Sequence, residues 1–416
     1  MVAPVRPEIL PRRCVPADRV TGDRSVPAIV PVSATMQKVM SVDPSNPPPP
    51  APPAKFAVCL LADVDAYDRL GPALRFLTVG LLDQSVVPIL IGPAPTDSAL
   101  SGPIERIAFE PPRWPLTRLA TWWLADDVSR RLDDLRIDTP PVVHALSPRM
   151  ASFAAHLAAG GGTDPLVSVD DLQIARSPTA VSAIPANARL VTSSDVVRAA
   201  LATSLDVATI RPGVPSAGRA HPLRDPRRQA AIAYAGPLRD ESAMDLLLRA
   251  FAELRRDHSD TLLFVIGHGP AEPGMRRLAN ELHLTERVMF TGRLEPWGDA
   301  LAGADLLCLP AAETAVSVVP IQAMALGLPV IAAAGSAHDC LIDERTAWLF
   351  PGGDGTALTE QLRRVLRDPA AAAALAARGQ AYVAAEHGPG RMVEGYARLY
   401  QSLALKQRTL RLPDSP

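Results

Sequence analysis

The sequence from 288 to 351, VMFTGRLEPWGDALAGADLLCLPAAETAVSVVPIQAMALGLPVIAAAGSAHDCLIDERTAWLFP, decides the fold of this chain. An apolar segment at 319–326 predicts a helix, because Gly327 is a good C-cap and Pro329 follows just beyond it. Three further apolar segments predict short strands at 288–290, 305–309 and 329–333.

A strand, a helix and a second strand at this spacing predict a βαβ unit. The strands of such a unit are parallel and buried on both faces. Ligands of parallel α/β sheets bind beyond the carboxyl ends of the strands. We therefore expect a binding site at the two loops that follow these strands, 292–296 and 310–317.

The same alternation of buried strands and helices extends upstream through most of the chain. The runs that predict strands lie at 56–62, 86–91, 231–235 and 261–266. We predict an α/β protein with two Rossmann-like, doubly wound domains, at 55–214 and 229–385. A polar, proline-rich linker at 215–228 joins them, and a return helix and tail occupy 386–416.

Residues 1–54 form a separate segment that ends in SNPPPPAPPA. Proline lacks a backbone donor and favours extended chain, so we expect a disordered, proline-rich arm. No apolar run follows a basic start, which argues against a secretory signal.

Composition narrows the classes of function. The chain has 416 residues, 48% hydrophobic and 21% charged, with a net charge of −2. This charge provides no basic field for nucleic acid. No apolar run is long enough for a transmembrane helix. The four cysteines show no metal-ligand spacing, and Cys59 and Cys308 lie in apolar strands. We expect a cytoplasmic protein without a metal, and peripheral contact with a membrane stays open.

The run GADLLCLPAAETAVSVVPIQAMALGLPVIAAAG at 303–335 resembles the donor-binding core of family 4 GT-B glycosyltransferases (glycosyl transferases group 1). Those enzymes carry ADxxxLPSxxEGFGxxxLEAMAxGxPVVAxxxGG at this place. Further similarities are the segments at 141–147, 164–171, 188–194 and 209–214, which resemble strands and strand ends of the family's first domain. The turn at 267–270 resembles the family's GxGP. The resemblance implies the GT-B fold, in which two Rossmann-like domains face a cleft.

The resemblance also implies a donor site for a nucleotide-diphosphate sugar, which is a substrate and not a cofactor. In the family the second glutamate of EGFGxxxLE accepts hydrogen bonds from the ribose, and Gln322 has that place here. The residues expected at the donor are Gly236, Arg239, Gly267, Gly292, Arg293, Thr314, Ser317, Val318 and Gln322.

Several polar positions of the family pattern are replaced in this chain. The phosphate-binding Arg and Lys correspond to Pro237 and Ser242, so Arg239 and Arg293 are the candidate substitutes. The family's cleft histidine corresponds to Asp170. The first glutamate corresponds to Thr314, with Glu313 one residue earlier. Asp170 and Glu313 are the candidate catalytic residues.

The first domain has a partial match to the family's glycine-rich turn. Gly71 and Arg75 keep part of a GGxxR-like pattern, and we expect a helix to begin at Gly71–Pro72. The amides of a helix N-terminus there would face an acceptor or a phosphate. A purely structural turn explains the pattern equally well.

Two functions from different classes remain. The first is a glycosyltransferase, retaining by resemblance, that moves a sugar from a nucleotide sugar to a glycan, lipid or small-molecule acceptor. The second is a degenerate glycosyltransferase-like binding or scaffold protein that has lost transfer. An epimerase or phosphorylase on the same fold is a third, but it too would need the missing phosphate-binding residues.

Overall fold

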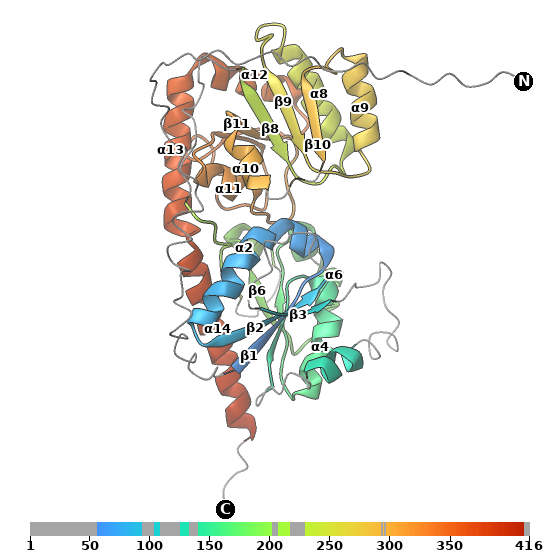
Figure 1. The fold of residues 1–416 in the computed structure, drawn as a ribbon, viewed down its shortest axis with the longest axis vertical. Helices are drawn as coiled ribbons and strands as arrows, with labels where there is room; N and C mark the ends of the chain where they lie inside the picture. The colour runs from blue at the N-terminus through green and yellow to red at the C-terminus, as the bar shows by residue number, and fades with distance from the viewer. Residues whose placement is uncertain are drawn as a thin grey trace, which may run out of the picture. The chain divides into compact units, whose positions relative to one another are not determined.

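The computed structural model describes residues 56–93, 104–108, 125–132, 140–201, 207–216, 229–292, 294 and 297–411 (Figure 1). The predicted arm at 1–54 and nearly all of the linker at 215–228 lie outside these ranges.

The first domain is built on a parallel sheet. Within the described residues its strand order is β3-β2-β1-β4-β5-β6-β7, and every neighbouring pair is parallel. Successive residues of β1 face opposite sides and both sides are buried, as in a doubly wound sheet. The strands are β1 (Phe56–Leu61), β2 (Val86–Gly92), β3 (Glu105–Ala108), β4 (Val142–Ala145), β5 (Leu166–Ser168), β6 (Arg189–Thr192) and β7 (Ala208–Thr209).

The second domain repeats this design with the order β10-β9-β8-β11-β12-β13, again parallel throughout. The predicted βαβ unit is confirmed, since β11 and β12 pair in parallel and α11 lies between them in the chain. Gly327 has a φ of 71° after that helix, as expected of a C-cap glycine. The strands are β8 (Ala231–Ala235), β9 (Leu262–Ile266), β10 (Val288–Gly292), β11 (Leu306–Leu309), β12 (Val330–Ala333) and β13 (Trp348–Phe350).

Helices cover both faces of the two sheets (Figure 1). Those of the first domain are α2 (Val64–Asp83), α4 (Ala151–Gly160), α5 (Leu172–Arg176), α6 (Pro178–Ser182) and α7 (Asp195–Ala200), with the short 3-10 helix η2 (Pro148–Met150). Those of the second domain are α8 (Glu241–Leu254), α9 (Glu272–Glu281), α10 (Trp297–Ala302), α11 (Val319–Ala325), α12 (Gly355–Arg367) and α13 (Pro369–Glu386). The predicted buried cysteines, Cys59 and Cys308, are fully buried in β1 and β11.

The predicted return helix is α14 (Pro389–Arg411), which packs beside α2 and β4 of the first domain. Gly80 permits close approach, because a Cβ there would lie 2.4 Å from Val393. His144 in β4 anchors the helix: its Nδ1 lies 2.7 Å from the Tyr400 hydroxyl, and its Nε2 lies 2.9 Å from Ser168 Oγ. Burial lowers the pKa of His144 to about 3, so the ring stays neutral and structural.

Helix α2 corrects one expectation. It begins at Val64 and not at Gly71, because the Asp63 carboxylate caps it by accepting a hydrogen bond from the Ala66 N–H at 2.7 Å. Pro72 therefore lies inside the helix. The predicted anion site at a helix start beside Gly71 is wrong, since no helix begins there.

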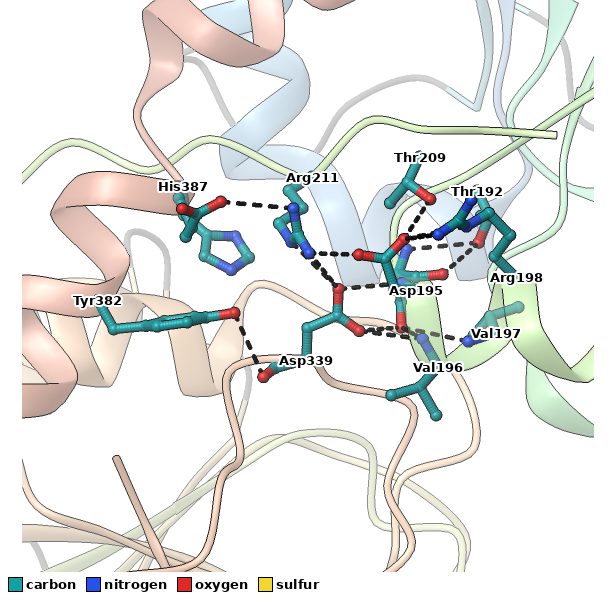
Figure 2. Close-up of polar contacts among 12 residues, drawn as sticks. Thr192, Asp195, Val196, Val197, Arg198, Thr209, Arg211, Asp339, Tyr382 and His387 are labelled. Carbon is teal, nitrogen blue, oxygen red and sulfur yellow. Dashed lines mark hydrogen bonds and ion pairs between the residues drawn. The ribbon is translucent and has the colours of Figure 1, made fainter. Parts of the chain in front are cut away.

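A polar network joins the domains near the segments where the chain passes between them (Figure 2). Asp339 follows β12 in the second domain but accepts hydrogen bonds from Ser194 Oγ at 2.7 Å, the Asp195 N–H at 3.0 Å and the Val196 N–H at 3.1 Å. The carboxylate of one domain thus caps α7 of the other.

Arg211 completes this interdomain network. Its guanidinium reaches Asp339 at 3.1 Å, Asp195 at 2.6 Å and Glu386 at 3.4 Å (Figure 2). Asp339 is 8% exposed and Arg211 is 23% exposed, so water screens this pair less than a surface pair. The network fixes α7 against the loop after β12.

Candidate functional site

A cavity of about 500 Å³ lies at the carboxyl ends of β8 and β9. Its walls come from both domains: the middle of α2, residues 214–215, the turns after β8 and β9, Leu294 with Gly298 of α10, and two residues of α11. The cavity is therefore a cleft site. Of the two loops at which the sequence predicted the site, 292–296 contributes Leu294 to the wall and 310–317 contributes no residue.

Glycines build the second-domain wall. Gly236 and Gly267 have φ values of 149° and 143°, and a Cβ on Gly267 would lie 1.9 Å from the Gly236 carbonyl oxygen. A Cβ on Gly269 would lie 2.3 Å from the Leu238 carbonyl oxygen. The two turns can pack backbone against backbone only because these side chains are absent. Their peptide groups consequently form part of the cavity surface.

Gln322 of α11 supplies a polar group on the same cavity wall. Its Oε1 is buried and has no hydrogen-bond partner among the described residues. A Cβ on Gly298 would lie 1.9 Å from Gln322 Nε2, so a glycine in α10 is what makes room for the amide. Buried amide oxygens normally accept a hydrogen bond, and Gln322 is thus ready to accept one from a ligand.

Two arginines reach the cavity, one from each domain. Arg239 follows β8, and Arg75 lies on α2. The other walls are largely apolar, with Ile266, Val319 and Phe76 among them. An apolar pocket with a few convergent polar and cationic groups suits a ligand with a flat ring and an anionic part.

The residues expected at the donor divide into three groups. Gly236, Arg239, Gly267 and Gln322 line the cavity. Arg293 lies outside the described residues. The third group has no place in the cavity wall and consists of Gly292, Thr314, Ser317 and Val318.

Local hydrogen bonds explain why three of these four residues, all in the loop before α11, lie away from the cavity. Val318 is fully buried and donates its N–H to the Arg69 carbonyl oxygen, while its neighbour Val319 takes the place on the cavity wall. The Ser317 N–H donates to His338 Nε2 at 2.9 Å. The Thr314 carbonyl oxygen accepts from the Leu172 N–H at 2.8 Å, and so faces the first domain.

Asp170 and Glu313, the candidate catalytic residues, also lie outside the cavity wall. Asp170 is buried. Its Oδ1 accepts from the Ser193 N–H at 2.6 Å, while Oδ2 has no partner among the described residues. Burial raises its pKa. Its carbonyl oxygen accepts from the Val316 N–H at 2.8 Å, so the loop of the second domain covers it directly.

Glu313 belongs to a second polar cluster with Ser317 and His338. Its Oε2 lies 3.3 Å from Ser317 Oγ and 3.4 Å from His338 Nε2. Burial raises the pKa of Glu313 to about 7 and lowers that of His338 to about 4. Because His338 Nε2 accepts from the Ser317 N–H, its ring proton lies on Nδ1. Burial therefore favours the protonated form of Glu313 in this cluster.

Arg69 is the residue that sequence reasoning missed. Its Nη1 donates to the Val316 carbonyl oxygen at 2.6 Å, so α2 of the first domain holds the loop before α11. The positive charge of Arg69 also opposes the rise in pKa of Asp170 and Glu313. No motif marks it, and the helix that carries it was expected to begin two residues later.

Among the described residues no group of three His, Cys, Asp or Glu side chains could hold a metal ion. None of the helices in the described part of the chain is both long and apolar enough to cross a bilayer.

Residues 229–368 match the family model described as glycosyl transferases group 1. A GDP-mannose-dependent alpha-(1-6)-phosphatidylinositol monomannoside mannosyltransferase of Mycolicibacterium smegmatis is 33% identical over 146 residues, 33% of this chain and 38% of the relative. A D-inositol 3-phosphate glycosyltransferase of Streptomyces avermitilis is 33% identical over 260 residues, 56% of this chain and 54% of the relative. The chain thus spans about half or less of the length of these curated relatives.

Solved structures match over much more of the chain. HepE of Anabaena, in complex with UDP and glucose, has a TM-score of 0.68 at 16% identity. The match covers 83% of this chain and 99% of the HepE chain. Sucrose-phosphate synthase of Thermosynechococcus elongatus has a TM-score of 0.67 at 19% identity, covering 85% of this chain and 100% of its own. At such identities the likeness establishes the fold, and the expected GT-B architecture is confirmed.

Proposed function

We propose that this chain, whose residues 229–368 match the family model of glycosyl transferases group 1, transfers a sugar from a nucleotide-diphosphate sugar to an acceptor hydroxyl. The observation that carries the proposal is the cavity between the domains, with glycine turns, arginines and an unpartnered amide oxygen on its walls. We place the domain limits at 55–214 and 229–385, as expected from the sequence.

Each wall has a part in the proposed donor complex. The apolar surface of Ile266 and Val319 packs against the nucleoside. Gln322 Oε1 accepts a hydrogen bond from a ribose hydroxyl. The peptide groups of Gly236 and Gly267 and the guanidinium of Arg239 lie by the diphosphate. Negative charge grows on the diphosphate as the glycosidic bond breaks, so fixed dipoles and cations there stabilise the transition state.

The names of the relatives and of a structural neighbour suggest which nucleotide the donor carries. One uses GDP-mannose, others act on D-inositol 3-phosphate, and HepE binds UDP and glucose. We propose a hexosyl donor carrying GDP or UDP, with retention of configuration at the sugar. The acceptor, a glycan, a lipid or a small molecule, would enter from the first domain, where α2 forms the cavity wall.

Calorimetric titration with UDP and GDP tests the donor site. Wild-type protein should bind one of them, and Gln322→Leu should weaken that binding about fivefold by removing the hydroxyl acceptor at similar volume. Thr314→Ala is the matched control, because Thr314 aligns with a family donor residue but does not line the cavity. If Thr314→Ala weakens binding and Gln322→Leu does not, the cavity is not the donor site.

A specific observation favours the alternative of a binding protein without transfer. Asp170 and Glu313 lie off the cavity, and Asp171 pairs with Ala315 in an antiparallel bridge between the domains. The cavity wall therefore carries no carboxylate from either candidate catalytic residue. Nucleotide binding without release of sugar from GDP-mannose or UDP-glucose, with or without an acceptor extract, would support this alternative.

A further inference from the structure

Arg239 is held at the cavity by a rigid backbone. The Leu238 N–H donates to the His268 carbonyl oxygen at 3.1 Å, and the Tyr234 hydroxyl donates to the Pro237 carbonyl oxygen at 3.0 Å. Leu238 itself is fully buried. The Arg239 side chain, by contrast, is 59% exposed, so the guanidinium can move while its loop stays in place.

Asp65 of the first domain engages this guanidinium. Arg239 Nη2 lies 2.6 Å from Asp65 Oδ1, and Arg149 Nη1 lies 2.7 Å from Asp65 Oδ2. Partial burial would raise the pKa of Asp65, but Arg239, Arg149 and Arg69 together lower it. At neutral pH the carboxylate is ionised and shared between arginines of both domains.

We propose that Asp65 competes with the donor's diphosphate for Arg239 and thereby sets the affinity of the cavity for nucleoside diphosphates. This inference rests on the proposed function of the cavity as a donor site. The diphosphate carries more charge than a carboxylate and offers two oxygens to a guanidinium, so it can displace Asp65 from Arg239.

The arrangement around Asp65 makes the exchange feasible. Asp65 keeps its bond to Arg149 when Arg239 leaves, so no carboxylate is left unpaired in the cleft. Arg239 needs only a side-chain rotation, since it already lines the cavity. The exchange also breaks the Asp65–Arg239 ion pair between the domains. Donor binding would thus remove one interdomain contact beside α2.

Arg239 is the one arginine or lysine that the second domain places in the described cavity wall. The family's Arg and Lys positions hold Pro237 and Ser242, so within the described cavity wall Arg239 is the guanidinium that this domain offers to a phosphate. A carboxylate that neutralises it therefore affects affinity directly. Asp65 therefore affects the affinity for nucleoside diphosphates although it lies outside the cavity wall.

The test measures dissociation constants for UDP, GDP, uridine and guanosine by calorimetry. Asp65→Asn should tighten the nucleoside diphosphate about two- to fivefold, the range expected for loss of one exposed ion pair. The affinity for the nucleoside should not change, because a nucleoside has no phosphate. In an Arg239→Ala background Asp65→Asn should have no effect.

Two controls separate the exchange from simpler causes. Glu241→Gln removes an exposed carboxylate on the first turn of α8, close in sequence to Arg239 but outside the pair, and should leave the affinity unchanged. Helix α2 is capped by Asp63 and not by Asp65, so Asp65→Asn should fold normally. Circular dichroism and the melting temperature check this.

The possible outcomes are distinct. Equal tightening by Asp65→Asn in the wild-type and Arg239→Ala backgrounds would mean diffuse repulsion and would overturn the exchange. Unchanged or weaker binding in Asp65→Asn would also overturn it, while the proposed function would stand. If neither wild type nor Asp65→Asn binds any nucleotide, the proposed donor site fails and the exchange with it.

Discussion

Asp339→Asn should weaken the polar contacts between the two domains and lower the stability of the protein. The asparagine keeps the shape of the side chain but loses its negative charge. In the wild type the Asp339 carboxylate accepts hydrogen bonds from Arg211 and from three donors at the start of α7 (Figure 2). The test therefore removes electrostatic attraction between the domains without creating a cavity.

The size of the effect follows from the contacts. One part is a weakened cap on α7, which costs about 1 kcal/mol. The other is a weakened ion pair, which also costs about 1 kcal/mol, because Arg211 keeps Asp195 and Glu386 as partners. A total loss of about 2 kcal/mol should lower the melting temperature by about 2–5 °C.

Differential scanning calorimetry measures this loss against a matched control. Asp354→Asn weakens the cap of α12, which lies wholly within the second domain, and should cost only about 1 kcal/mol. A double-mutant cycle of Asp339→Asn with Arg211→Leu isolates the pair, and we expect a coupling of at least about 0.5 kcal/mol. Additive effects in this cycle would refute the claim that the pair joins the domains.

Three further predictions concern the site. Arg239→Ala should lower sugar transfer more than tenfold, equivalent to about 1.4 kcal/mol of lost transition-state stabilisation, and an unchanged rate would exclude this residue from phosphate binding. Glu313 has a folded-state pKa of about 7 against 4.5 in the unfolded chain, so its contribution to stability falls as pH rises from about 4.5 to about 7. Glu313→Gln should remove that part of the pH dependence, as melting curves at pH 5 and pH 8 would show, and an unchanged difference between the two would contradict the assignment. Gly267→Ala should destabilise the protein by at least about 1–3 kcal/mol in urea unfolding, because the added Cβ meets the Gly236 carbonyl oxygen in a strained backbone conformation; a neutral result would mean that the two turns move apart freely.

The elements of this protein are largely determined by local sequence. Apolar runs bounded by glycine and proline marked nearly every strand of both sheets, since a parallel strand must be buried on both faces. The short edge strands β3, β7 and β13 escaped this reasoning, because they have only four, two and three residues. Gly236 and Gly267 were also readable as cavity residues, because only glycine allows two backbones to approach this closely.

The side chains of the site depend on contacts between distant parts of the chain. The alignment placed Thr314, Ser317 and Val318 at the donor, but hydrogen bonds to the first domain and to His338 turn this loop away from the cavity. Asp65 and Asp339 have no motif at all. Their partners lie 174 and 128 positions away in the sequence, in Arg239 and Arg211, on the other domain in each case. Hydrophobic periodicity predicts which residues of one helix or strand are buried. An ion pair between two domains forms only when the domains have packed together. These two ion pairs therefore depend on the tertiary structure and could not be predicted from the sequence.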